Sequence, residues 1–378
     1  MTKLFELIRA EVVRRGVLPF ARFMELALYC PEYGYYETKK DNPGRRGDFY
    51  TSVSVGNLFG ELLAFQFAEW LETLAASHQP STVSICEAGA HDGQLAKDVL
   101  DWLRIKKPQL FEQINYYILE PSPRRTEWQR ENLKDFPNVR WISDFNAPTL
   151  QHFNGIIFSN ELLDAFPIHR FGWDAKEKKW FEWGVAFDGE KFVWERLSNS
   201  LVPQNGEKAG VRGALVDSPF SILHLPSALL EALPDNYTIE ISPAAEDWWR
   251  NAAGILQSGK LLTFDYGFTA DEQFSPARTS GTLRAYFRHH HVDDILANVG
   301  EQDLTAHVNF SAIQKIGETA GLKTEIFYSQ PKFLTQILEK TLKAKNFGEW
   351  NSARARQFQT LTHPEHLGRA FKVLIQSR

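Results

Sequence analysis

The chain of 378 residues is 43% hydrophobic and 24% charged, which is typical of a globular protein with a sizeable core and excludes a disordered chain. Its formal net charge of −5 argues against the dominant basic face that broad nucleic-acid binding requires, so we expect no nucleic-acid partner. No stretch approaches the roughly 20 consecutive apolar residues that cross a bilayer, so we expect no membrane span.

The two cysteines, Cys30 and Cys86, stand in apolar surroundings. Their spacing is neither that of a secreted disulfide framework nor that of a metal-ligand pair. Residues 1–15 alternate apolar and charged side chains, so they lack the uninterrupted apolar core of a signal peptide. Together these features predict a cytoplasmic protein in a reducing compartment.

The N-terminal part of the chain is predicted to be helical. Apolar residues recur at helical spacing over 4–12, and Pro19 opens a second apolar run that reaches residue 28. Residues 31–47 contain too many turn-forming residues for a regular element, so we expect an ordered loop over a site. A long, mostly buried helix is expected at 55–74.

From residue 83 onward, short β-branched or aromatic runs alternate with helical segments, which is typical of βαβ units around a parallel sheet. The expected strands are 83–86, 116–119, 139–142, 155–158 and 260–264, with helices at 95–103 and 124–133. The first four strands end in polar or acidic residues: Glu87, Glu120, Asp144 and Asn160. The predicted fold class is therefore α/β with a Rossmann-like sheet.

An antiparallel insertion interrupts the alternation. Two strand-like runs, 180–187 and 192–194, flank Asp188-Gly189, which predicts a two-residue hairpin turn. Towards the end of the chain we expect a helix at 310–320, a strand at 323–328 and a helix at 331–345. The predicted domains are a helical N-terminal segment with a covering loop (1–75), the Rossmann-like core (76–168 and 237–330), an inserted β-rich domain that shapes the acceptor site (169–236) and a C-terminal helical segment (331–378).

The loop after the first strand reads Glu87-Ala88-Gly89-Ala90-His91-Asp92-Gly93. Glycines at such a turn let a ligand approach the backbone, and the N-terminus of the next helix offers free N–H groups. The run begins with an acid and lacks the G-x-G-x-x-G of dinucleotide sites. It therefore suits a nucleoside that carries an amino-acid cation and no phosphate, such as S-adenosylmethionine. The alternative is an ordinary strand-to-helix turn.

Two further acids extend this predicted cofactor site. Glu120 can accept hydrogen bonds from both ribose hydroxyls, and we expect its replacement by Ala to weaken cofactor affinity without unfolding the chain. Asp144 can accept a hydrogen bond from the exocyclic amine of adenine, while the adjacent Phe145 packs near the ring. Each acid could instead be a solvated loop residue. Because ligands of open parallel sheets bind outside the strand ends, we assign these residues to one site.

The fourth strand leads into Ser159-Asn160-Glu161-Leu162-Leu163-Asp164. In a doubly wound sheet this loop faces the reacting end of the cofactor. An amide and carboxylates here can hold a guanidinium or amine by charge-assisted hydrogen bonds and aim its lone pair at a methyl carbon. We expect Asn160 to align the reactants and contact the cofactor, and Glu161 and Asp164 to orient the acceptor. The alternative is a helix cap formed by Asn160 or Asp164.

Taken in order, the motifs of this chain resemble those of the MidA family of class I methyltransferases. The motifs are Gly47-Asp48-Phe49-Tyr50-Thr51-Ser52, the loop at 87–93, Asn160-Glu161-Leu162-Leu163-Asp164-Ala165-Phe166-Pro167, Glu240-Ile241-Ser242-Pro243, Asp265-Tyr266-Gly267, Gly281-Thr282-Leu283-Arg284 with Tyr286, and Asp303-Leu304-Thr305-Ala306-His307-Val308-Asn309-Phe310. The resemblance runs from about residue 20 to about residue 338.

This resemblance implies a class I methyltransferase sheet and S-adenosylmethionine as cofactor. It suggests that the segment with Gly47, Asp48, Phe49 and Thr51 closes over the methionine end of the cofactor. It also places His307 in a motif that lines the acceptor cleft. Mitochondrial relatives in the family are regarded as protein arginine methyltransferases that act in respiratory complex I assembly, which favours an arginine acceptor here.

The chain departs from the family pattern at His91, where such families usually carry a glycine. The side chain either crowds the carboxylate end of the cofactor or points outward. A second histidine feature, His289-His290-His291, could suggest a metal site. Adjacent residues do not converge on one ion without special backbone geometry, so we expect a solvated turn and no metal.

Three functional hypotheses follow from the sequence. The leading one is methylation of a protein arginine side chain. The second is O- or N-methylation of a small molecule, in a pocket lined by the aromatic insertion at 171–197. The third is a non-catalytic assembly factor in which His91 weakens cofactor binding. The expected partner is thus a protein or small-molecule methyl acceptor, and a homodimer is left open.

Overall fold

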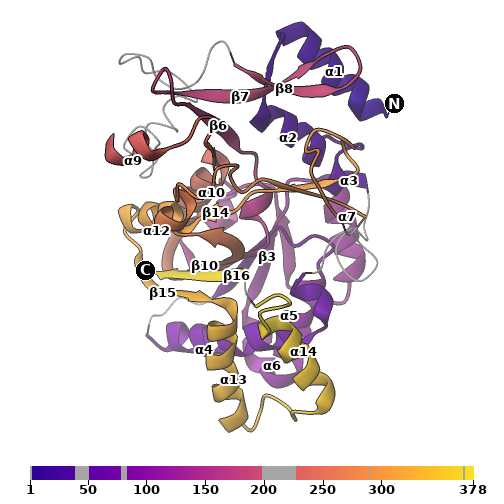
Figure 1. Ribbon diagram of the computed structural model, residues 1–378. Helices are drawn as coiled ribbons and strands as arrows, with labels where there is room; N and C mark the ends of the chain where they lie inside the picture. The colour runs from indigo at the N-terminus through magenta and orange to yellow at the C-terminus, as the bar shows by residue number, and fades with distance from the viewer. Residues whose placement is uncertain (1, 39–50, 78–82, 198–226, 289, 369–370) are drawn as a thin grey trace. The chain divides into compact units, whose positions relative to one another are not determined.

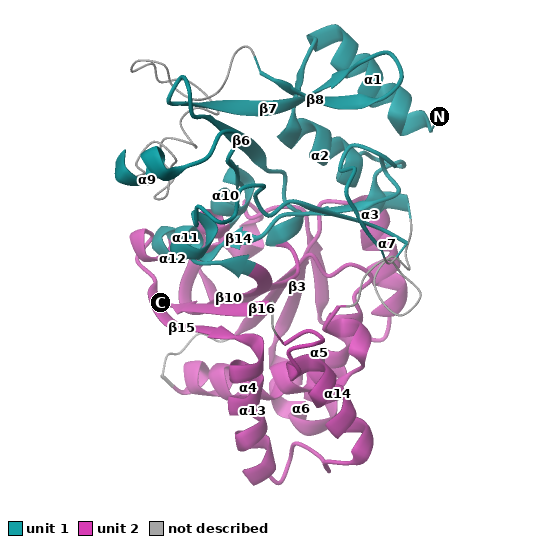
Figure 2. Ribbon diagram, viewed as in Figure 1, with its two compact units in different colours: residues 1–39, 163–248, 267–316 teal, residues 40–162, 249–266, 317–378 magenta. Residues whose placement is uncertain are grey.

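The computed structural model describes residues 2–38, 51–77, 83–197, 227–288, 290–368 and 371–378 (Figure 1). The chain forms two compact units, which are coloured separately in Figure 2. Unit 1 consists of Met1–Lys39, Leu163–Trp248 and Gly267–Ile316, and unit 2 consists of Lys40–Leu162, Trp249–Tyr266 and Gly317–Arg378. Each unit is therefore assembled from segments that are far apart in the chain.

Unit 2 is built around a sheet with the strand order β15-β16-β10-β5-β2-β3-β4. The strands are β2 (Ser84–Ala88), β3 (Asn115–Leu119), β4 (Val139–Ile142), β5 (Phe153–Asn160), β10 (Leu256–Phe268), β15 (Lys323–Ser329) and β16 (Phe371–Ser377). The five strands from β10 to β4 run parallel, whereas β16 is antiparallel to both β10 and β15. The predicted fold class, α/β with a Rossmann-like sheet, is confirmed.

The strand order places a topological switch point between β2 and β5. From β2 the sheet grows outward through β3 and β4, whereas β5 is followed by β10 on the other side. Ligands of open α/β sheets bind outside the carboxyl ends of the strands at such a point. Ala88, at the end of β2, pairs with Ser159 near the end of β5. The loops that begin at Gly89 and Asn160 therefore leave the sheet at the same edge.

Helices cover this sheet through a continuous core. They are α4 (Leu58–Ser77), α5 (Gln94–Lys106), α6 (Pro108–Gln113), α7 (Pro123–Asn132), α13 (Gln330–Lys343) and α14 (Ser352–Thr362), with short helical turns η1 (Val53–Val55) and η2 (Pro148–Leu150). α4 contacts α5, α13 and α14. Leu62, Val99, Phe158, Phe264 and Phe333 belong to the core, and burial of each such side chain contributes roughly 1.5–3 kcal/mol.

The C-terminal segment at 331–378, predicted to be helical, contains α13 and α14 but also strand β16. Its residues Phe371, Val373, Leu374 and Ile375 are all fully buried. β16 lies between β10 and β15, with neighbours on both sides. This pairing brings together residues that are distant in the chain, which no local pattern in the sequence indicates.

Unit 1 contains two smaller sheets. The larger has the order β1-β7-β6-β9 with β8 paired to β7, and consists of β1 (Leu18–Pro19), β6 (His169–Asp174), β7 (Lys179–Phe187), β8 (Phe192–Arg196) and β9 (Thr238–Ile241). The smaller has the order β12-β11-β13, with β11 (Arg284–Phe287), β12 (His290–Val292) and β13 (Asp303–Thr305). A short strand, β14 (Val308–Asn309), pairs with Gly267 and Phe268 at the end of β10.

The helices that lie wholly or partly in unit 1 come from four regions of the chain. They are α1 (Lys3–Arg15), α2 (Phe20–Tyr29), α3 (Tyr35–Thr38), η3 (Leu163–Ala165), α9 (Ser227–Ala232), α10 (Pro243–Ile255), α11 (Ala270–Gln273) and α12 (Phe310–Thr319). α1 and α2 both contact β7. The N-terminal helices therefore belong to the same unit as the predicted insertion.

Unit 1 is thus larger than the predicted insertion at 169–236. Aromatic packing explains the difference, since the rings of Phe5 on α1 and Phe192 on β8 lie 4.7 Å apart between centroids. Within the insertion, Phe171 and Trp173 belong to a buried hydrophobic cluster. These aromatic side chains form a core, and we do not assign them to a ligand pocket.

Two local predictions in unit 1 are corrected by the structure. The hairpin of β7 and β8 has a loop of residues 188–191 in place of a two-residue turn. The Oδ1 atom of Asp188 accepts hydrogen bonds of 2.9 Å from the N–H groups of Glu190 and Lys191, which closes the longer loop. Of the three histidines expected in a solvated turn, His289 lies outside the described residues, and His290 and His291 lie on β12, paired with β11.

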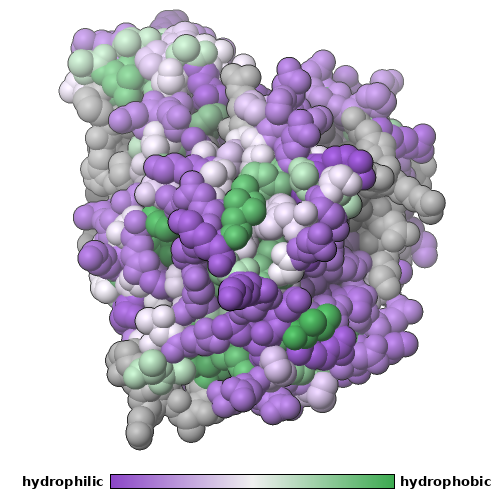
Figure 3. Space-filling model, turned by 90° about the horizontal axis from the view of Figure 1, so that it is seen from below, coloured by the Kyte–Doolittle hydropathy of each residue, from purple (hydrophilic) through white to green (hydrophobic). Residues whose placement is uncertain are grey.

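Hydrophilic side chains cover most of the face drawn in Figure 3, and hydrophobic side chains lie there in small separate groups. Two large hydrophobic residues of unit 2 are exposed, Ile105 at 68% and Leu342 at 63%. Scattered exposure of this kind is normal for a globular protein. Within the described part of the chain, no helix combines the length and the apolar character needed to cross a membrane.

Candidate active site

The loop at 87–93 joins β2 to α5 and contains two glycines that other residues could not replace without strain. Gly89 and Gly93 have φ angles of 72° and 86°, a region that L residues rarely adopt. A Cβ atom at Gly89 would lie 2.8 Å from Cδ1 of Leu162, and one at Gly93 would lie 3.0 Å from Cδ1 of Leu133. The loop is therefore shaped by close packing as well as by the turn itself.

His91 stands between these glycines with a φ angle of 48°. Its side chain is 21% exposed, and its backbone carbonyl accepts a 3.0 Å hydrogen bond from Nε2 of Gln129. The Nε2 atom of the His91 ring is buried and has no hydrogen-bond partner among the described residues. A non-glycine residue in this backbone conformation is uncommon and frequently marks a functional position.

Glu87 lies inside unit 2 with 2% of its surface exposed. The hydroxyl of Tyr116 on β3 donates a 2.6 Å hydrogen bond to Oε2 of Glu87. Burial raises the pKa of Glu87 to about 8, and the charges of Asp92 and Asp98 add to this effect, while the Tyr116 hydrogen bond opposes it. Glu87 therefore joins β2 to β3 beneath the loop.

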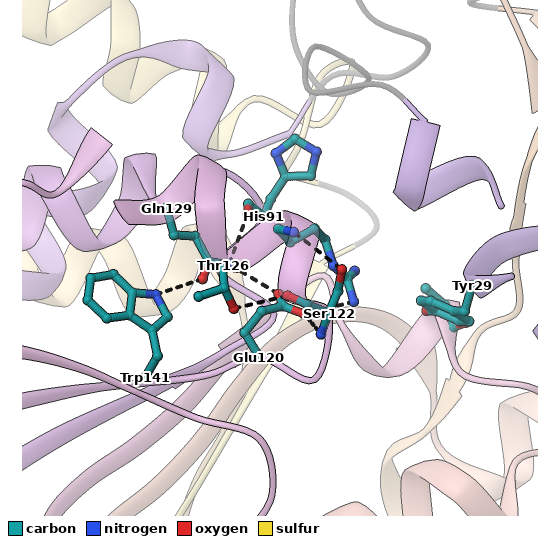
Figure 4. Close-up of polar contacts among 9 residues, drawn as sticks. Tyr29, His91, Glu120, Ser122, Thr126, Gln129 and Trp141 are labelled. Carbon is teal, nitrogen blue, oxygen red and sulfur yellow. Dashed lines mark hydrogen bonds and ion pairs between the residues drawn. The ribbon is translucent and has the colours of Figure 1, made fainter. Parts of the chain in front are cut away.

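Glu120 follows β3 and is 4% exposed. Figure 4 shows the polar contacts around it, which connect the end of β3 to α7 and β4. Its Oε1 atom accepts a hydrogen bond of 2.9 Å from the N–H group of Ser122 and lies 2.9 Å from the guanidinium of Arg125. Its Oε2 atom accepts a 3.1 Å hydrogen bond from Gln129. The carboxylate is thus held in place by Ser122, Arg125 and Gln129.

Gln129 connects this carboxylate to its surroundings. Its Nε2 atom donates to both Glu120 and the carbonyl of His91, and its Oε1 atom accepts a 3.0 Å hydrogen bond from the Trp141 indole. The side chain is fully buried. Neither Gln129 nor Arg125 was predicted from the sequence. The one sequence signal that could have indicated Arg125 and Gln129 is that they follow Glu120 closely in the chain, on the first turns of α7.

Asp144 lies beyond β4 and is exposed. Its Oδ1 atom accepts a 2.7 Å hydrogen bond from the N–H group of Asn146, and its Oδ2 atom accepts one of 3.0 Å from the Ser143 hydroxyl. The Asn146 N–H bond, followed by the Ser143 bond, lowers the pKa of Asp144. Phe145 is half-buried beside it. The Asp144 carboxylate is therefore charged and accessible to a ligand. The same two hydrogen bonds also fit the alternative, an ordinary turn without a ligand.

Asn160 ends β5, and Glu161 follows with a φ angle of 52°. The Oε1 atom of Glu161 accepts hydrogen bonds from Nδ2 of Asn160 at 3.0 Å and from the N–H group of Ser52 at 3.3 Å. The Oδ1 atom of Asn160 is buried without a hydrogen-bond partner among the described residues. The amide of Asn160 is therefore oriented with its oxygen available.

The predicted covering segment is only partly described. Gly47, Asp48 and Phe49 lie outside the described residues. Thr51 is 7% exposed, and its N–H and hydroxyl groups exchange hydrogen bonds of 3.1 Å with the side chain and N–H group of Ser54. Thr51 thus stabilises the turn that precedes α4.

The other predicted acid, Asp164, belongs to unit 1 and is 4% exposed. Its carbonyl accepts a 2.9 Å hydrogen bond from Ala306. Nearby, the hydroxyl of Tyr36 donates a 2.7 Å hydrogen bond to Asp303, which is 2% exposed. Burial first, and then the charges of Asp303 and Asp164, hold the pKa of Tyr36 well above its usual value. Unit 1 therefore brings two buried carboxyl groups close to one phenol.

His307 lies in the same unit and is half-buried. The His307 ring stacks on Phe268 with 4.6 Å between centroids. The backbone N–H group of His307 donates a 3.1 Å hydrogen bond to the Thr282 hydroxyl. Burial, assisted by the positive charges of Arg284 and Arg278, lowers the pKa of His307 to about 4. The imidazole is therefore neutral at ordinary pH and is a weak proton acceptor.

Behind His307 lies a cavity of about 30 Å³ that Glu240 and Gln273 also line, which is room for only a few water molecules. Oε2 of Glu240 accepts hydrogen bonds of 2.7 and 3.1 Å from the N–H and hydroxyl groups of Thr282. Glu240 and Thr282 belong to motifs that carried no assigned role in the sequence. Their contacts show that they support His307.

The structure thus divides the predicted residues between two places. Glu87, Gly89, His91, Gly93, Glu120, Asn160 and Glu161 gather along the carboxyl edge of β2, β3 and β5 in unit 2, while Asp164 and His307 belong to unit 1. Asp303 and Tyr36 were not predicted to be functional. Among the described residues, no group of three or more His, Cys, Asp or Glu side chains could hold a metal ion.

Comparison with known proteins identifies the family of this chain. A family model described as "Putative S-adenosyl-L-methionine-dependent methyltransferase" matches residues 62–328. The chain belongs to this family. The predicted enzyme class and the predicted cofactor, S-adenosylmethionine, are therefore confirmed.

This methyltransferase is similar to animal proteins named protein arginine methyltransferase NDUFAF7, mitochondrial. It is 25% identical to the Drosophila melanogaster homologue over 97% of this chain and 83% of the relative. It is 24% identical to the Homo sapiens protein over 84% of this chain and 69% of the relative. It also resembles a crystal structure from Burkholderia thailandensis that is bound to S-adenosyl-homocysteine, with a TM-score of 0.79, 30% identity, and coverage of 99% of this chain and 92% of the other.

The residues at the switch point of this methyltransferase suit the cofactor. Two buried polar atoms there, Oδ1 of Asn160 and Nε2 of His91, have no hydrogen-bond partner among the described residues. A carboxamide oxygen accepts hydrogen bonds from an ammonium group, and an imidazole N–H donates to a carboxylate. The methionine end of the cofactor carries both groups. The unsatisfied atoms therefore match the chemistry of that ligand.

Proposed function

We propose that the methyl acceptor of this S-adenosylmethionine-dependent methyltransferase is an arginine side chain of a protein. The observation that supports it best is the pair of buried acids Asp164 and Asp303 around the Tyr36 hydroxyl. A guanidinium stays positively charged in proteins and forms planar, paired hydrogen bonds with carboxylates. The names of the animal relatives, which are protein arginine methyltransferases, also favour this acceptor.

In this proposal unit 1 supplies the residues for the acceptor. Asp164 and Asp303 hold the guanidinium by charge-assisted hydrogen bonds and fix the direction of the reacting nitrogen. Asp164 then accepts the proton that the nitrogen releases when it is methylated. His307 is neutral because its pKa is about 4, so it contributes a hydrogen bond or a packing surface and does not serve as the base.

Unit 2 supplies the residues for the cofactor, which when bound carries an electrophilic methyl group on a sulfonium. Asn160 accepts a hydrogen bond from the ammonium group, and His91 donates one to the carboxylate. Glu120 accepts hydrogen bonds from the ribose hydroxyls, and Asp144 accepts one from the adenine amine beside Phe145. Glu161 orients Asn160 through their 3.0 Å hydrogen bond.

Transfer of a labelled methyl group from S-adenosylmethionine to a cell extract tests the acceptor. We expect the label in protein, and on arginine after complete digestion. Label confined to small molecules would support the alternative of O- or N-methylation of a metabolite. Calorimetry with S-adenosylmethionine tests the third hypothesis, a non-catalytic assembly factor, because that hypothesis requires weak binding or none.

The compartment is a separate proposal. We propose that this protein works in the cytoplasm, on the basis of its two free cysteines, Cys30 and Cys86. Burial raises the pKa of the Cys86 thiol, which keeps it unreactive. The names of the animal relatives include the word mitochondrial, which describes those proteins and not this chain. Cell fractionation with an antibody against the native chain distinguishes cytosol from membrane-bounded fractions, and size measurements in solution test the homodimer.

A further inference from the structure

A chain of hydrogen bonds links the C-terminal helices of unit 2 to the end of β5. Nε2 of Gln330, the first residue of α13, donates to the carbonyl of Leu361 in α14 at 3.1 Å. Oε1 of Gln330 accepts a 3.3 Å hydrogen bond from the hydroxyl of Ser52. The N–H group of Ser52 donates to Glu161, whose same oxygen accepts from Asn160. Gln330 and Ser52 are both fully buried.

The donors and acceptors in this chain fix each group in one orientation. Nε2 of Gln330 donates to the Leu361 carbonyl, and Oε1 of Gln330 accepts from the Ser52 hydroxyl. Glu161 accepts from Nδ2 of Asn160, and the Asn160 oxygen has no hydrogen-bond partner in the described part of the chain. That oxygen is the one proposed above to accept from the cofactor. The orientation of Asn160 therefore depends on residues 52 and 330.

A second contact holds the same segment at its other end. Oε1 of Gln357 on α14 accepts a 3.0 Å hydrogen bond from the N–H group of Leu58, the first residue of α4. Gly56 has a φ angle of 141°, and a Cβ atom there would lie 2.7 Å from the Gln357 side chain. Arg354 adds an ion pair of 2.7 Å to Glu61. α14 thus fixes the start of α4 while α13 fixes Ser52.

Ser52, Gln330 and Gln357 all lie outside residues 62–328, the part that matches the family model. We propose that Gln330, through Ser52 and Glu161, is a positioning residue for Asn160 and thereby for cofactor binding, with Gln357 holding the segment from Ser52 to Leu58 in place. This inference rests on the proposed role of Asn160. By this inference, the C-terminal helices α13 and α14 contribute to the binding of S-adenosylmethionine.

The test is calorimetric titration of the full chain with S-adenosylmethionine, with thermal unfolding measured in parallel. Gln330→Ala and Ser52→Ala should each weaken binding by about two- to tenfold, the effect of one lost hydrogen bond. Combining them should weaken binding no further than Gln330→Ala alone, because they share one contact. The matched control is Gln336→Ala, which changes an exposed glutamine of the same helix. Gln357→Ala should also weaken binding, because it frees the segment from Ser52 to Leu58, and Gln359→Ala, which changes an exposed glutamine of α14, is its control.

A positioning role also requires that the effect pass through Asn160. In an Asn160→Ala background, Gln330→Ala should cause no additional loss of affinity. Additive losses would mean that Gln330 acts only on general stability, and this would overturn the inference. If Asn160→Ala alone leaves affinity unchanged, the proposed role of Asn160 fails. If it weakens binding while Gln330→Ala and Ser52→Ala both behave like Gln336→Ala, the inference fails and the role of Asn160 stands. Ser52→Ala alone decides the outcome should Gln330→Ala not fold.

Discussion

The Tyr116 hydroxyl donates a 2.6 Å hydrogen bond to the carboxyl group of Glu87, and both side chains are almost completely buried. This contact joins β2 to β3 at the base of the segment at 87–93. Because burial raises the pKa of Glu87 to about 8, the carboxyl group keeps a proton in the folded protein at pH values where an exposed glutamate has lost it. Folding and protonation of Glu87 are therefore linked.

The sign of this linkage gives the first prediction. Between the usual pKa of 4.5 and the folded pKa of about 8, the folded state carries one more proton at Glu87 than the unfolded state. The contribution of Glu87 to the free energy of unfolding therefore falls as pH rises through this range. Glu87→Gln should give a flatter dependence in urea unfolding at several pH values. Parallel curves for wild type and variant would contradict the linkage, and Glu127→Gln on the exposed face of α7 is the control.

A second prediction concerns Glu120. Glu120→Ala is expected to weaken cofactor affinity without unfolding the chain, and the structure adds that this carboxylate pairs with the mostly buried Arg125 at 2.9 Å. Removal of one partner from a buried ion pair costs about 3 kcal/mol, because the other charge is left without compensation. We therefore expect Glu120→Ala to lower both the free energy of unfolding and the affinity for S-adenosylmethionine. Glu127→Ala should change stability by less than about 0.5 kcal/mol. An unaltered melting temperature in Glu120→Ala would contradict this prediction and would show that the Arg125 guanidinium becomes solvated when its partner is removed.

The third prediction decides between the two interpretations of His91. Replacement by Gly removes the strain of a positive φ angle but also removes the unpartnered Nε2 atom. If that nitrogen binds the carboxylate of the cofactor, His91→Gly should weaken binding of S-adenosylmethionine by about three- to tenfold. Calorimetric titration measures the change. Tighter binding in the variant would mean instead that the side chain crowds the ligand.

The fourth prediction separates acceptor residues from cofactor residues. Asp164→Asn and Asp303→Asn should each lower the rate of methyl transfer by roughly 10²-fold, because the acceptor loses a charged hydrogen-bond partner. The affinity for S-adenosylmethionine should stay close to that of wild type. Asp293→Asn is the matched control, since its side chain is fully exposed in the same unit. Equal losses of cofactor affinity and of transfer rate would remove these acids from the proposed acceptor site.

The fifth prediction is the titration of His307. Its folded pKa of about 4 lies below the usual 6.5, so the unfolded state binds a proton first as the pH falls. The contribution of His307 to the free energy of unfolding therefore decreases as pH falls from about 6.5 to 4. In NMR spectra the imidazole resonances should titrate near pH 4, with His307→Gln used for assignment. A midpoint near 6.5 would show that the ring is solvated.

Much of unit 2 could be predicted from sequence because its signals are local. A parallel strand that is buried on both faces is a short apolar run in the sequence. The helix that follows it has apolar residues at helical spacing. β2, β3, β4 and β5 therefore lie close to their expected positions. The order of chain segments then placed Glu120 and Asn160 at strand ends. Strand β16 escaped prediction because its pairing with β10 and β15 brings together residues that are distant in the chain.

The sequence alone determined that an α/β sheet carries acids and glycines at its carboxyl edge, since period, turn residues and strand ends are properties of neighbouring residues. Only the tertiary structure decided which of these groups remain available. Glu87 accepts a hydrogen bond from Tyr116, and Glu120 is held by Arg125 and Gln129. Asn160 and His91 each keep one buried atom that has no partner among the residues that the structure describes. The hydrogen bond between Ser52 and Glu161 spans 109 positions, and contacts over such distances arise only when the whole core packs.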